Sequence, residues 1–165
     1  MMSLESELFK LAAAFKGRTD HIQGAGGNIS VKNDSELCIK ASGYDFSEIE
    51  SRRGFVKLNF HDVAKYFLNT SEDRNTGESK SIQIINQSIL NNNDLKPSME
   101  TGFHALLGKV VVHTHSVYTN LVNCMSFPEK IRKEIEVESE YRIIWLPYAS
   151  PGFQLSKSIA ESLKR

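Results

Sequence analysis

The chain has 165 residues, a length typical of one domain, and its 40% hydrophobic content is enough to bury a core. Twenty lysines and arginines balance twenty acidic residues, so the formal net charge is zero. This balance argues against broad electrostatic binding of nucleic acid or an anionic membrane, because either needs a surplus of basic residues. We therefore expect no nucleic-acid partner and no membrane partner.

The cysteine content and the N-terminus predict a cytoplasmic protein. Cys38 and Cys124 are too few for a disulfide scaffold, which favours a reducing compartment. No apolar run approaches the roughly 20 residues that cross a bilayer. Glu5 and Glu7 stand where a signal peptide has a basic segment, and Lys10 interrupts the apolar stretch.

Hydrophobic periodicity and turn residues divide the first half of the chain into short elements. Ser3 is the predicted N-cap of the first helix and Gly17 its stop. A glycine-dense stretch at 24–28 leads into a predicted hairpin. The predicted strands of this half lie at 29–32, 36–40 and 54–60. The predicted helices lie at 4–16, 61–68 and 82–90, and the polar stretch 70–80 is expected to be a surface loop.

The second half of the chain is dominated by helical patterns around one apolar strand. Pro97 is expected to open a helix, because proline is tolerated in the first turn. The β-branched run 109–115 is typical of a buried central strand. Further predicted elements are helices at 97–107, 118–124, 129–138 and 154–164 and a strand at 141–146. The whole pattern predicts one α/β domain.

His113 and His115 are the sharpest chemical signal in the chain. In a strand, side chains two residues apart point to the same face, about 7 Å apart along the backbone. That geometry suits two ligands of a Zn²⁺-type ion, whose catalytic sites usually take three protein ligands and leave one position open. The alternative is a pair of histidines satisfied by local hydrogen bonds, and the pair alone does not decide between the two.

Glu100 is the candidate acid/base, because it falls at the start of the helix that leads into the histidine strand. A carboxylate there could bind a metal or exchange a proton with a substrate. The same carboxylate could simply stabilise the helix N-terminus through the macrodipole. His104, four residues on, lies on the same helical face, either as a partner of this site or as a packing residue.

Two turns rich in small residues suggest an anion site. Backbone N–H groups of the 24–28 stretch can bind an anion, and the Asn28 side chain adds a donor. Ser42 and Gly43 offer the same chemistry, and Ser98 lies near a helix start, where the dipole favours an anion. Plain hairpin architecture is the alternative, since the sequence contains neither a P-loop nor a dinucleotide fingerprint.

Taken together, five motifs resemble the class II aldolase/adducin family, over the N-terminal three quarters of its sugar-phosphate aldolases. The G-N-x-S segment, the small-residue S-G turn, the P-S-S-E motif, the H-x-H pair and the P-Y-A-x-x-G segment occur in the family's order, and the motifs cover nearly the whole chain. They lie at 23–30, 41–43, 97–100, 113–115 and 146–152. The resemblance implies an α/β fold with a central, mainly antiparallel sheet flanked by helices.

The resemblance also implies a site and a reaction. The two histidines, His113 and His115, would bind Zn²⁺ or another divalent ion, and Glu100 would be the catalytic acid/base. In such enzymes the metal polarises a ketose and stabilises an enediolate while a C–C bond breaks or forms. The residues expected to bind the phosphate of a sugar phosphate are Asn28, Ser42, Gly43 and Ser98. A homo-oligomer, typically a tetramer, is implied as well.

The sequence departs from the family pattern in two places. Met99 replaces the second serine of the P-S-S-E motif and removes one hydroxyl donor at the expected phosphate. The third metal histidine, which the family supplies from a later strand, has no counterpart among His21, His61 and His104. We therefore expect a domain over 1–165 that lacks the family's C-terminal strand and helices, on the order of 40–50 residues at usual element sizes.

Two functions from different classes follow. The first is a metal-dependent aldolase, a lyase acting on a small sugar phosphate or related sugar. The second is a catalytically degenerate binding or assembly module that keeps the fold without the third metal histidine. A two-histidine site completed by Glu100 and water is physically permitted, so the missing histidine does not by itself separate them. A metal-dependent hydrolase would rest on the histidine pair alone.

Overall fold

The computed structural model describes residues 2–49, 53–91 and 94–164. Its centre is a four-stranded sheet with the order β3-β2-β1-β4, and every neighbouring pair of strands is antiparallel. The strands are β1 (Asn28–Lys32), β2 (Leu37–Lys40), β3 (Phe55–Leu58) and β4 (Val110–His113). The predicted α/β class and antiparallel sheet are confirmed.

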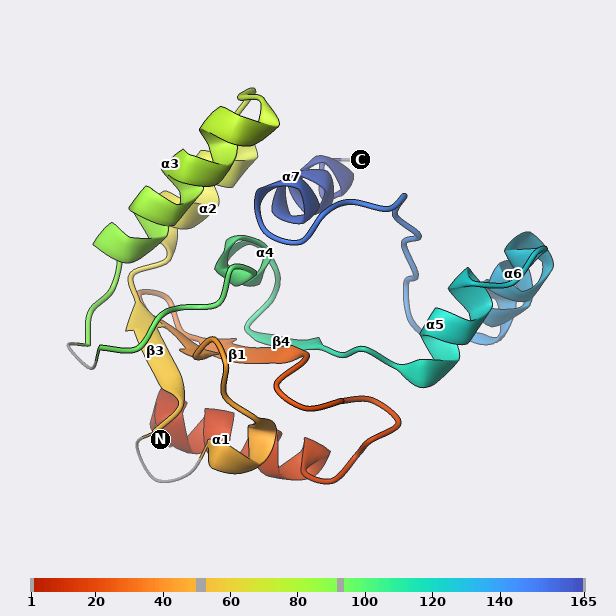
Figure 1. Cartoon of the computed structure of the whole chain (residues 1–165), viewed down its shortest axis with the longest axis horizontal. Helices are drawn as coiled ribbons and strands as arrows, with labels where there is room; N and C mark the ends of the chain where they lie inside the picture. Colours follow the sequence, from red (N-terminus) through yellow and green to blue (C-terminus); the bar gives the residue numbers. More distant parts are fainter. Residues whose placement is uncertain (1, 50–52, 92–93, 165) are drawn as a thin grey trace.

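Helices cover both faces of this sheet. Helix α1 packs on β1 and β2 from one side, while α2, α3, α4 and α7 pack together on the other side (Figure 1). The helices of the described residues are α1 (Leu4–Phe15), α2 (His61–Asn69), α3 (Arg74–Gln87), α4 (Thr101–Leu106), α5 (Val117–Asn123), α6 (Pro128–Glu138) and α7 (Phe153–Ser162), with a 3₁₀ turn η1 (Phe46–Glu48).

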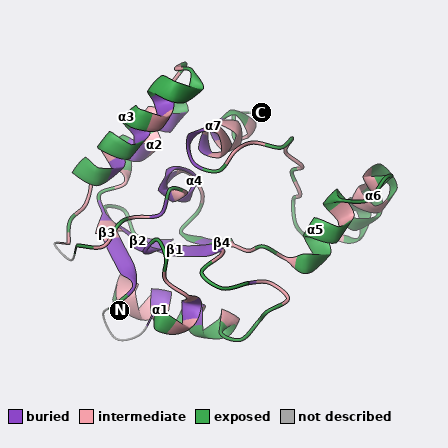
Figure 2. Cartoon of the chain, in the orientation of Figure 1, coloured by how far each residue is buried: buried purple, intermediate pink, exposed green. Residues whose placement is uncertain are grey.

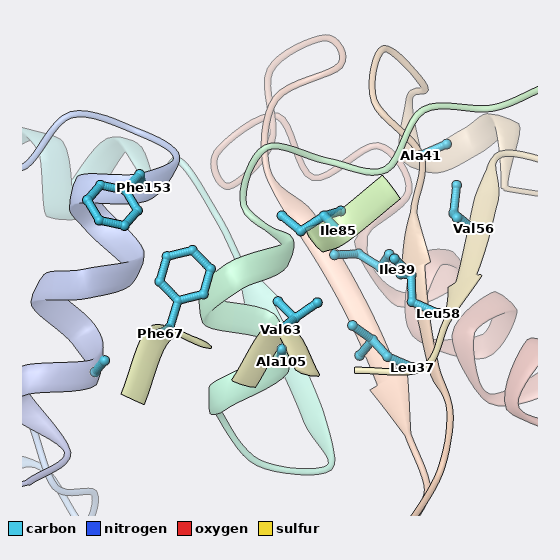
Figure 3. Packing of buried hydrophobic residues seen from close by; sticks show 11 residues of the cluster. Leu37, Ile39, Ala41, Val56, Leu58, Val63, Phe67, Ile85, Ala105 and Phe153 are labelled. Carbon is cyan, nitrogen blue, oxygen red and sulfur yellow. The ribbon is translucent and has the colours of Figure 1, made fainter. Parts of the chain in front are cut away.

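The alternation of side chains along β2 divides the core between the two faces. Leu37 and Ile39 point into a cluster with the helices α2, α4 and α7. In this cluster the tilted rings of Phe67 and Phe153 lie 5.8 Å apart, centroid to centroid (Figure 3). Cys38, between them in sequence, belongs to the second cluster under α1. Because side chains in a strand alternate between faces, four residues of β2 are enough to contribute to both cores.

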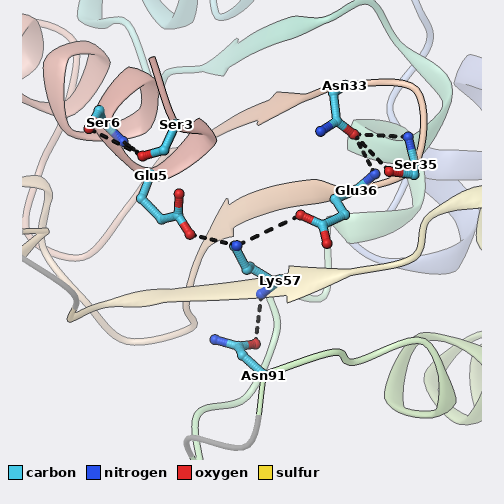
Figure 4. A network of polar contacts seen from close by, with 8 residues as sticks. All are labelled: Ser3, Glu5, Ser6, Asn33, Ser35, Glu36, Lys57 and Asn91. Carbon is cyan, nitrogen blue, oxygen red and sulfur yellow. Dashed lines mark hydrogen bonds and ion pairs between the residues drawn. The ribbon is translucent and has the colours of Figure 1, made fainter. Parts of the chain in front are cut away.

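Helix α1 is fixed to the sheet by a cap and an ion pair. The Ser3 hydroxyl accepts a hydrogen bond from the N–H of Ser6, which confirms the predicted N-cap. The Lys57 ammonium on β3 lies 2.5 Å from Glu5 Oε1 and 3.7 Å from Glu36 Oε2 (Figure 4). One lysine therefore links the first helix to two strands of the sheet.

The prediction of a surface loop at 70–80 is wrong beyond Asp73. Residues 74–87 form α3, and the Asp73 carboxylate accepts hydrogen bonds from the N–H groups of Asn75 and Thr76. This N-cap stabilises the start of the helix despite its polar composition. A helix that packs through a few small and apolar positions can also be polar on the rest of its surface. The predicted helix at 82–90 is the second half of α3, which ends at Gln87.

Three further predictions are corrected by the structure. The apolar run at 109–115 forms β4 only from Val110 to His113, and β4 lies at the sheet edge with Val110 and Val112 exposed, not at its centre. Pro97 pairs with Ala41 in an isolated β-bridge, so α4 begins at Thr101. The segment 141–146 has no strand, and its backbone runs as an irregular link to α7.

Helices α5 and α6 form an arm that extends away from the sheet and its covering helices (Figure 1). Neither helix of the arm contains a buried residue. Within the described part of the chain, no helix is both long and apolar enough to cross a bilayer.

Candidate active site

Glu100, His113 and His115 come together at the end of β4. The Nδ1 atom of His113 lies 2.8 Å from Oε2 of Glu100, and both side chains are largely shielded from solvent. The ring of His115 lies 5.0 Å from that of His113, centroid to centroid, at an interplanar angle of 65°. The structure therefore places side by side the three residues that the sequence proposed as catalytic acid/base and metal ligands.

The contact with Glu100 determines which nitrogen of His113 is open. An ionised carboxylate can only accept a hydrogen bond, so Nδ1 of His113 carries the proton and donates it. The lone pair then resides on Nε2, the state in which histidine binds a metal while a carboxylate orients the ring. Glu100 is the N-cap residue of α4, but its side chain makes no capping hydrogen bond. Its carboxylate is engaged by the histidine and not by the helix N-terminus.

His115 lies against the glycine-rich stretch. A Cβ atom at Gly26 would be 2.9 Å from Nδ1 of His115, closer than real Cβ contacts come, so the ring occupies space that a larger residue would fill. The backbone N–H of His115 donates to the carbonyl of His21 at 2.9 Å. The histidine pair and the glycine-rich stretch therefore form one continuous surface.

Asn28 is the first residue of β1 and pairs directly with His113 in the sheet. Its side chain is only 2% exposed, and Oδ1 has no hydrogen-bond partner among the described residues. Buried polar atoms are usually satisfied, so an unpaired acceptor beside the histidine pair identifies Asn28 as a candidate ligand-contacting residue.

The two remaining predicted anion-binding segments are neighbours. The β-bridge between Ala41 and Pro97 brings Ser42 and Gly43 next to the loop that contains Ser98. The N–H of Ser42 donates to the carbonyl of Lys96 at 2.9 Å, which leaves the Ser42 hydroxyl as the group that this residue can offer to an anion. Gly43 has φ = 81°, a left-handed conformation that favours glycine.

Ser98 connects this region to the acid/base candidate. Its hydroxyl oxygen accepts a hydrogen bond from the N–H of Glu100 at 3.2 Å, and its carbonyl accepts from Thr101. The Ser98 side chain is buried, and no residue of the described ranges accepts its O–H proton. Met99, which departs from the family motif, is exposed and contributes no hydroxyl.

His104 belongs to the packing between α4 and the sheet. Its Nδ1 lies 2.7 Å from the Ser30 hydroxyl, and the residue is fully buried. Burial, with smaller contributions from His113 and Lys32, lowers the pKa of His104 to about 3, so the ring is neutral. Of the two roles considered for His104, the geometry favours the packing residue.

The donor set fits two positions of a metal site. His113 and His115 can each present an imidazole nitrogen, and Glu100 orients the first of them. Across 2–49, 53–91 and 94–164, no group of three or more His, Cys, Asp or Glu side chains is arranged to hold a metal ion. Nε2 of His21 lies 3.4 Å from Oδ2 of Asp20, and Nε2 of His61 lies 2.8 Å from the carbonyl oxygen of Asp34. Both imidazoles have partners outside the cluster, so neither adds a ligand.

Lys40, the last residue of β2, was not predicted from the sequence as part of this region. Its ammonium group is buried and donates hydrogen bonds to the carbonyls of Ala25 and Tyr44, one in each of the two predicted anion-binding turns. The available signal was a lysine at the end of an otherwise apolar strand, directly before a turn of small residues.

The sheet covered by helices and the carboxylate–histidine cluster at its edge define an aldolase-type α/β domain. The chain belongs to the family described as Class II Aldolase and Adducin N-terminal domain, whose model matches residues 6–165.

Two solved structures share the fold. The N-terminal class II aldolase domain of a conserved protein from Thermoplasma acidophilum superposes with a TM-score of 0.79, at 25% identity over 98% of this chain and 76% of that one. An L-fuculose 1-phosphate aldolase has a TM-score of 0.50, at 22% identity over 75% of this chain and 50% of that one, which shows a shared fold alone.

One curated protein is similar in sequence. The uncharacterized oxidoreductase YuxG of Bacillus subtilis (strain 168) is 28% identical over 148 residues, 84% of this chain. The chain spans about a fifth of that relative's length, 20%.

Proposed function

We propose that this domain is a metal-dependent aldolase, a lyase that cleaves or forms a C–C bond in a small sugar phosphate or related sugar. The observation that carries the proposal is the 2.8 Å contact between Glu100 and His113, beside the ring of His115. A charge-assisted contact of this kind orients a ligating imidazole and keeps a carboxylate within reach of a bound substrate.

The residues around this contact have separate roles. His113 and His115 would hold a divalent ion such as Zn²⁺. When bound, the ion would polarise the carbonyl and hydroxyl oxygens of the sugar. The phosphate takes hydrogen bonds from the amide N–H of Asn28, the hydroxyls of Ser42 and Ser98 and the backbone N–H of Gly43. The unpaired Oδ1 of Asn28 is left to accept from a hydroxyl group of the sugar.

Glu100 moves the proton. In the cleavage direction it removes the proton from the hydroxyl group whose C–O bond becomes the carbonyl of the aldehyde product. The electron pair of the broken C–C bond passes to the fragment that keeps the original carbonyl, and the same proton returns to carbon there. The carboxylate thus ends the cycle in the state in which it began.

The Bacillus relative is named an oxidoreductase, but we do not propose hydride transfer for this domain. The stretch from Gly24 to Gly27 leads into β1, whereas a dinucleotide-binding fingerprint opens a helix. Assembly into a homo-oligomer, implied by the resemblance to class II aldolases, is part of this proposal.

The experiment combines metal content with turnover. Protein loaded with Zn²⁺ is dialysed and assayed for bound metal and for aldehyde release from a panel of small ketose phosphates. We expect about one ion per chain and measurable aldehyde release in the wild type, and loss of both in His113→Ala. His61→Ala is the matched control, because His61 is exposed and bonded to a carbonyl far from the cluster.

Two other outcomes of this experiment would contradict an aldolase function. Metal binding that depends on His113 without turnover on any sugar phosphate would favour the binding or assembly module. Wild-type protein that retains no metal and behaves like His113→Ala would overturn the proposal.

A further inference from the structure

Lys40 is a buried cation that pairs with no carboxylate among the described residues. The side chain is only 2% exposed, and lysine is almost never buried so fully unless it is paired. Burial lowers the pKa of Lys40, and the nearby carboxylates, Glu100 foremost, act in the opposite direction. The energetic cost of this burial has to be offset by the groups that the ammonium contacts.

The ammonium group of Lys40 connects two separate turns. It donates to the carbonyl of Ala25 at 3.2 Å and to the carbonyl of Tyr44 at 2.7 Å, and it lies 5.7 Å from the centroid of the Phe46 ring. Ala25 belongs to the glycine-rich stretch, and Tyr44 follows Ser42 and Gly43 directly. A single charged group therefore links these two turns.

Lys32 provides an internal comparison. It is also buried, and its ammonium also donates to two carbonyls, those of His104 at 3.2 Å and Ala105 at 2.6 Å. These carbonyls belong to α4, where a cation is expected because the last carbonyls of a helix are unsatisfied. Burial lowers the pKa of Lys32 to about 8. The carbonyls that bind Lys40 belong to turns, so the same explanation does not apply to Lys40.

We propose that Lys40 is a positioning residue for the phosphate group of the substrate. It holds the glycine-rich stretch and the Ser42–Gly43 turn in register and supplies positive charge behind them. The inference rests on the proposed function, which assigns the phosphate to these turns. The charge also offsets the repulsion that a phosphate dianion and the Glu100 carboxylate would exert on each other.

The test compares Lys40→Met with Lys32→Met, which remove the same charge from opposite faces of the sheet. Inorganic phosphate is titrated into each Zn²⁺-loaded protein by calorimetry, while ¹⁵N NMR follows the backbone amide signals of Ser42 and Gly43. We expect phosphate affinity to fall about tenfold or more in Lys40→Met and to stay within about twofold of wild type in Lys32→Met. Zinc uptake should be equal in all three proteins.

A measurement on the unaltered protein complements the variants, in case Lys40→Met does not fold. The Nζ signal of a buried ammonium is observable by NMR, and we expect it to shift with the same midpoint as the Ser42 and Gly43 amides during the phosphate titration. A static Nζ signal while those amides shift, or equal phosphate affinity in Lys40→Met and wild type, would overturn the inference and leave the aldolase proposal intact.

Failure of the proposed function gives a different result. If the wild type shows no phosphate-dependent shift at either turn, both the phosphate site and the role of Lys40 are wrong. Metal content and aldehyde release then test the rest of the aldolase proposal independently.

Discussion

The central sheet and the α5–α6 arm have opposite patterns of burial (Figure 2). All four residues of β2 and all five of β1 are buried, whereas α5 and α6 have no buried residue. Phe127 is 82% exposed and Val137 is 84% exposed, although both side chains are apolar. The comparison shows that periodicity predicts a helix without showing what covers its apolar face.

The candidate site lies where these two regions meet. His113 is the last residue of β4 and is held by Glu100, while His115 is two residues before the start of α5. One histidine of the pair is therefore fixed by the sheet, and the other is near the base of the arm. The following predictions test how far the division between sheet and arm extends.

Glu100→Gln should have the largest effect. Glutamine keeps the shape of the side chain but cannot take up the proton, so we expect aldehyde release to fall by about 10²–10⁴-fold. The measurement is the initial rate of retro-aldol cleavage, with urea unfolding to confirm that the fold is retained. Glu129→Gln, at an exposed position of the arm, should leave the rate unchanged; equal losses in both variants would contradict the role of Glu100.

The two cysteines should differ strongly in reactivity. Burial raises the pKa of the Cys38 thiol to about 12, so very little of this thiol is in the reactive thiolate form at neutral pH. Cys124, on the arm side, is exposed. We expect a thiol reagent to label Cys124 rapidly in the native protein and Cys38 only on unfolding. Rapid labelling of both thiols would mean that the sheet opens readily.

Truncation of aromatic side chains should separate the two regions by stability. Phe153→Ala removes a ring packed between Phe67 and Tyr66, and should lower the free energy of unfolding by about 3–5 kcal/mol. Phe127→Ala, on the arm, should change it by less than about 0.5 kcal/mol. Urea denaturation of both variants is the measurement. A large loss for Phe127→Ala would show that the arm packs against another surface in solution.

The smallest expected effect concerns the ion pair between α1 and β3. The hydrogen bond from Lys57 holds the pKa of Glu5 below its usual value of 4.5, so the contact stabilises the fold above that pH. The stabilisation is lost as the pH falls through the lowered pKa and Glu5 becomes protonated. Because both side chains are partly exposed, Lys57→Met should cost about 1 kcal/mol or less at pH 7.

The measurement is the free energy of unfolding of wild type and Lys57→Met between pH 7 and pH 3. The difference between the two proteins should shrink toward acid pH. A difference that grows as the pH falls would contradict the assigned direction of the Glu5 shift.

Most elements of the fold could be predicted from the sequence, because their signals are local. Ser3 caps α1 as expected, and the turn residues at 33–35 join β1 and β2 as expected. The errors arose where tertiary contacts decide. The valines at 110–112 have the composition of a central strand, but no local feature shows that β4 has only one neighbour within the described sheet.

The sequence proposed the residues of the candidate site but not their contacts. The motifs singled out Glu100 and both histidines, and the structure brings these side chains together and adds the carboxylate–imidazole hydrogen bond that orients His113. Lys40 escaped prediction because its partners are backbone carbonyls of turns, which leave no trace in residue type. Sequence patterns report on side chains more reliably than on the backbone groups that those side chains bind.

The pairing of β1 with β4 has a consequence for how a ligand affects the folding equilibrium. It joins segments that are far apart in the chain. A neighbouring hydrogen bond, between Ser30 of β1 and His104 of α4, spans 74 residues. Such contacts form only after a long loop has closed, so the unfolded chain holds no partial version of the cluster. A ligand that bridges Asn28 and His113 therefore binds the native state alone. At a hundredfold excess over its dissociation constant it would raise the free energy of unfolding by about 2.7 kcal/mol, which makes the thermal midpoint a direct measure of occupancy.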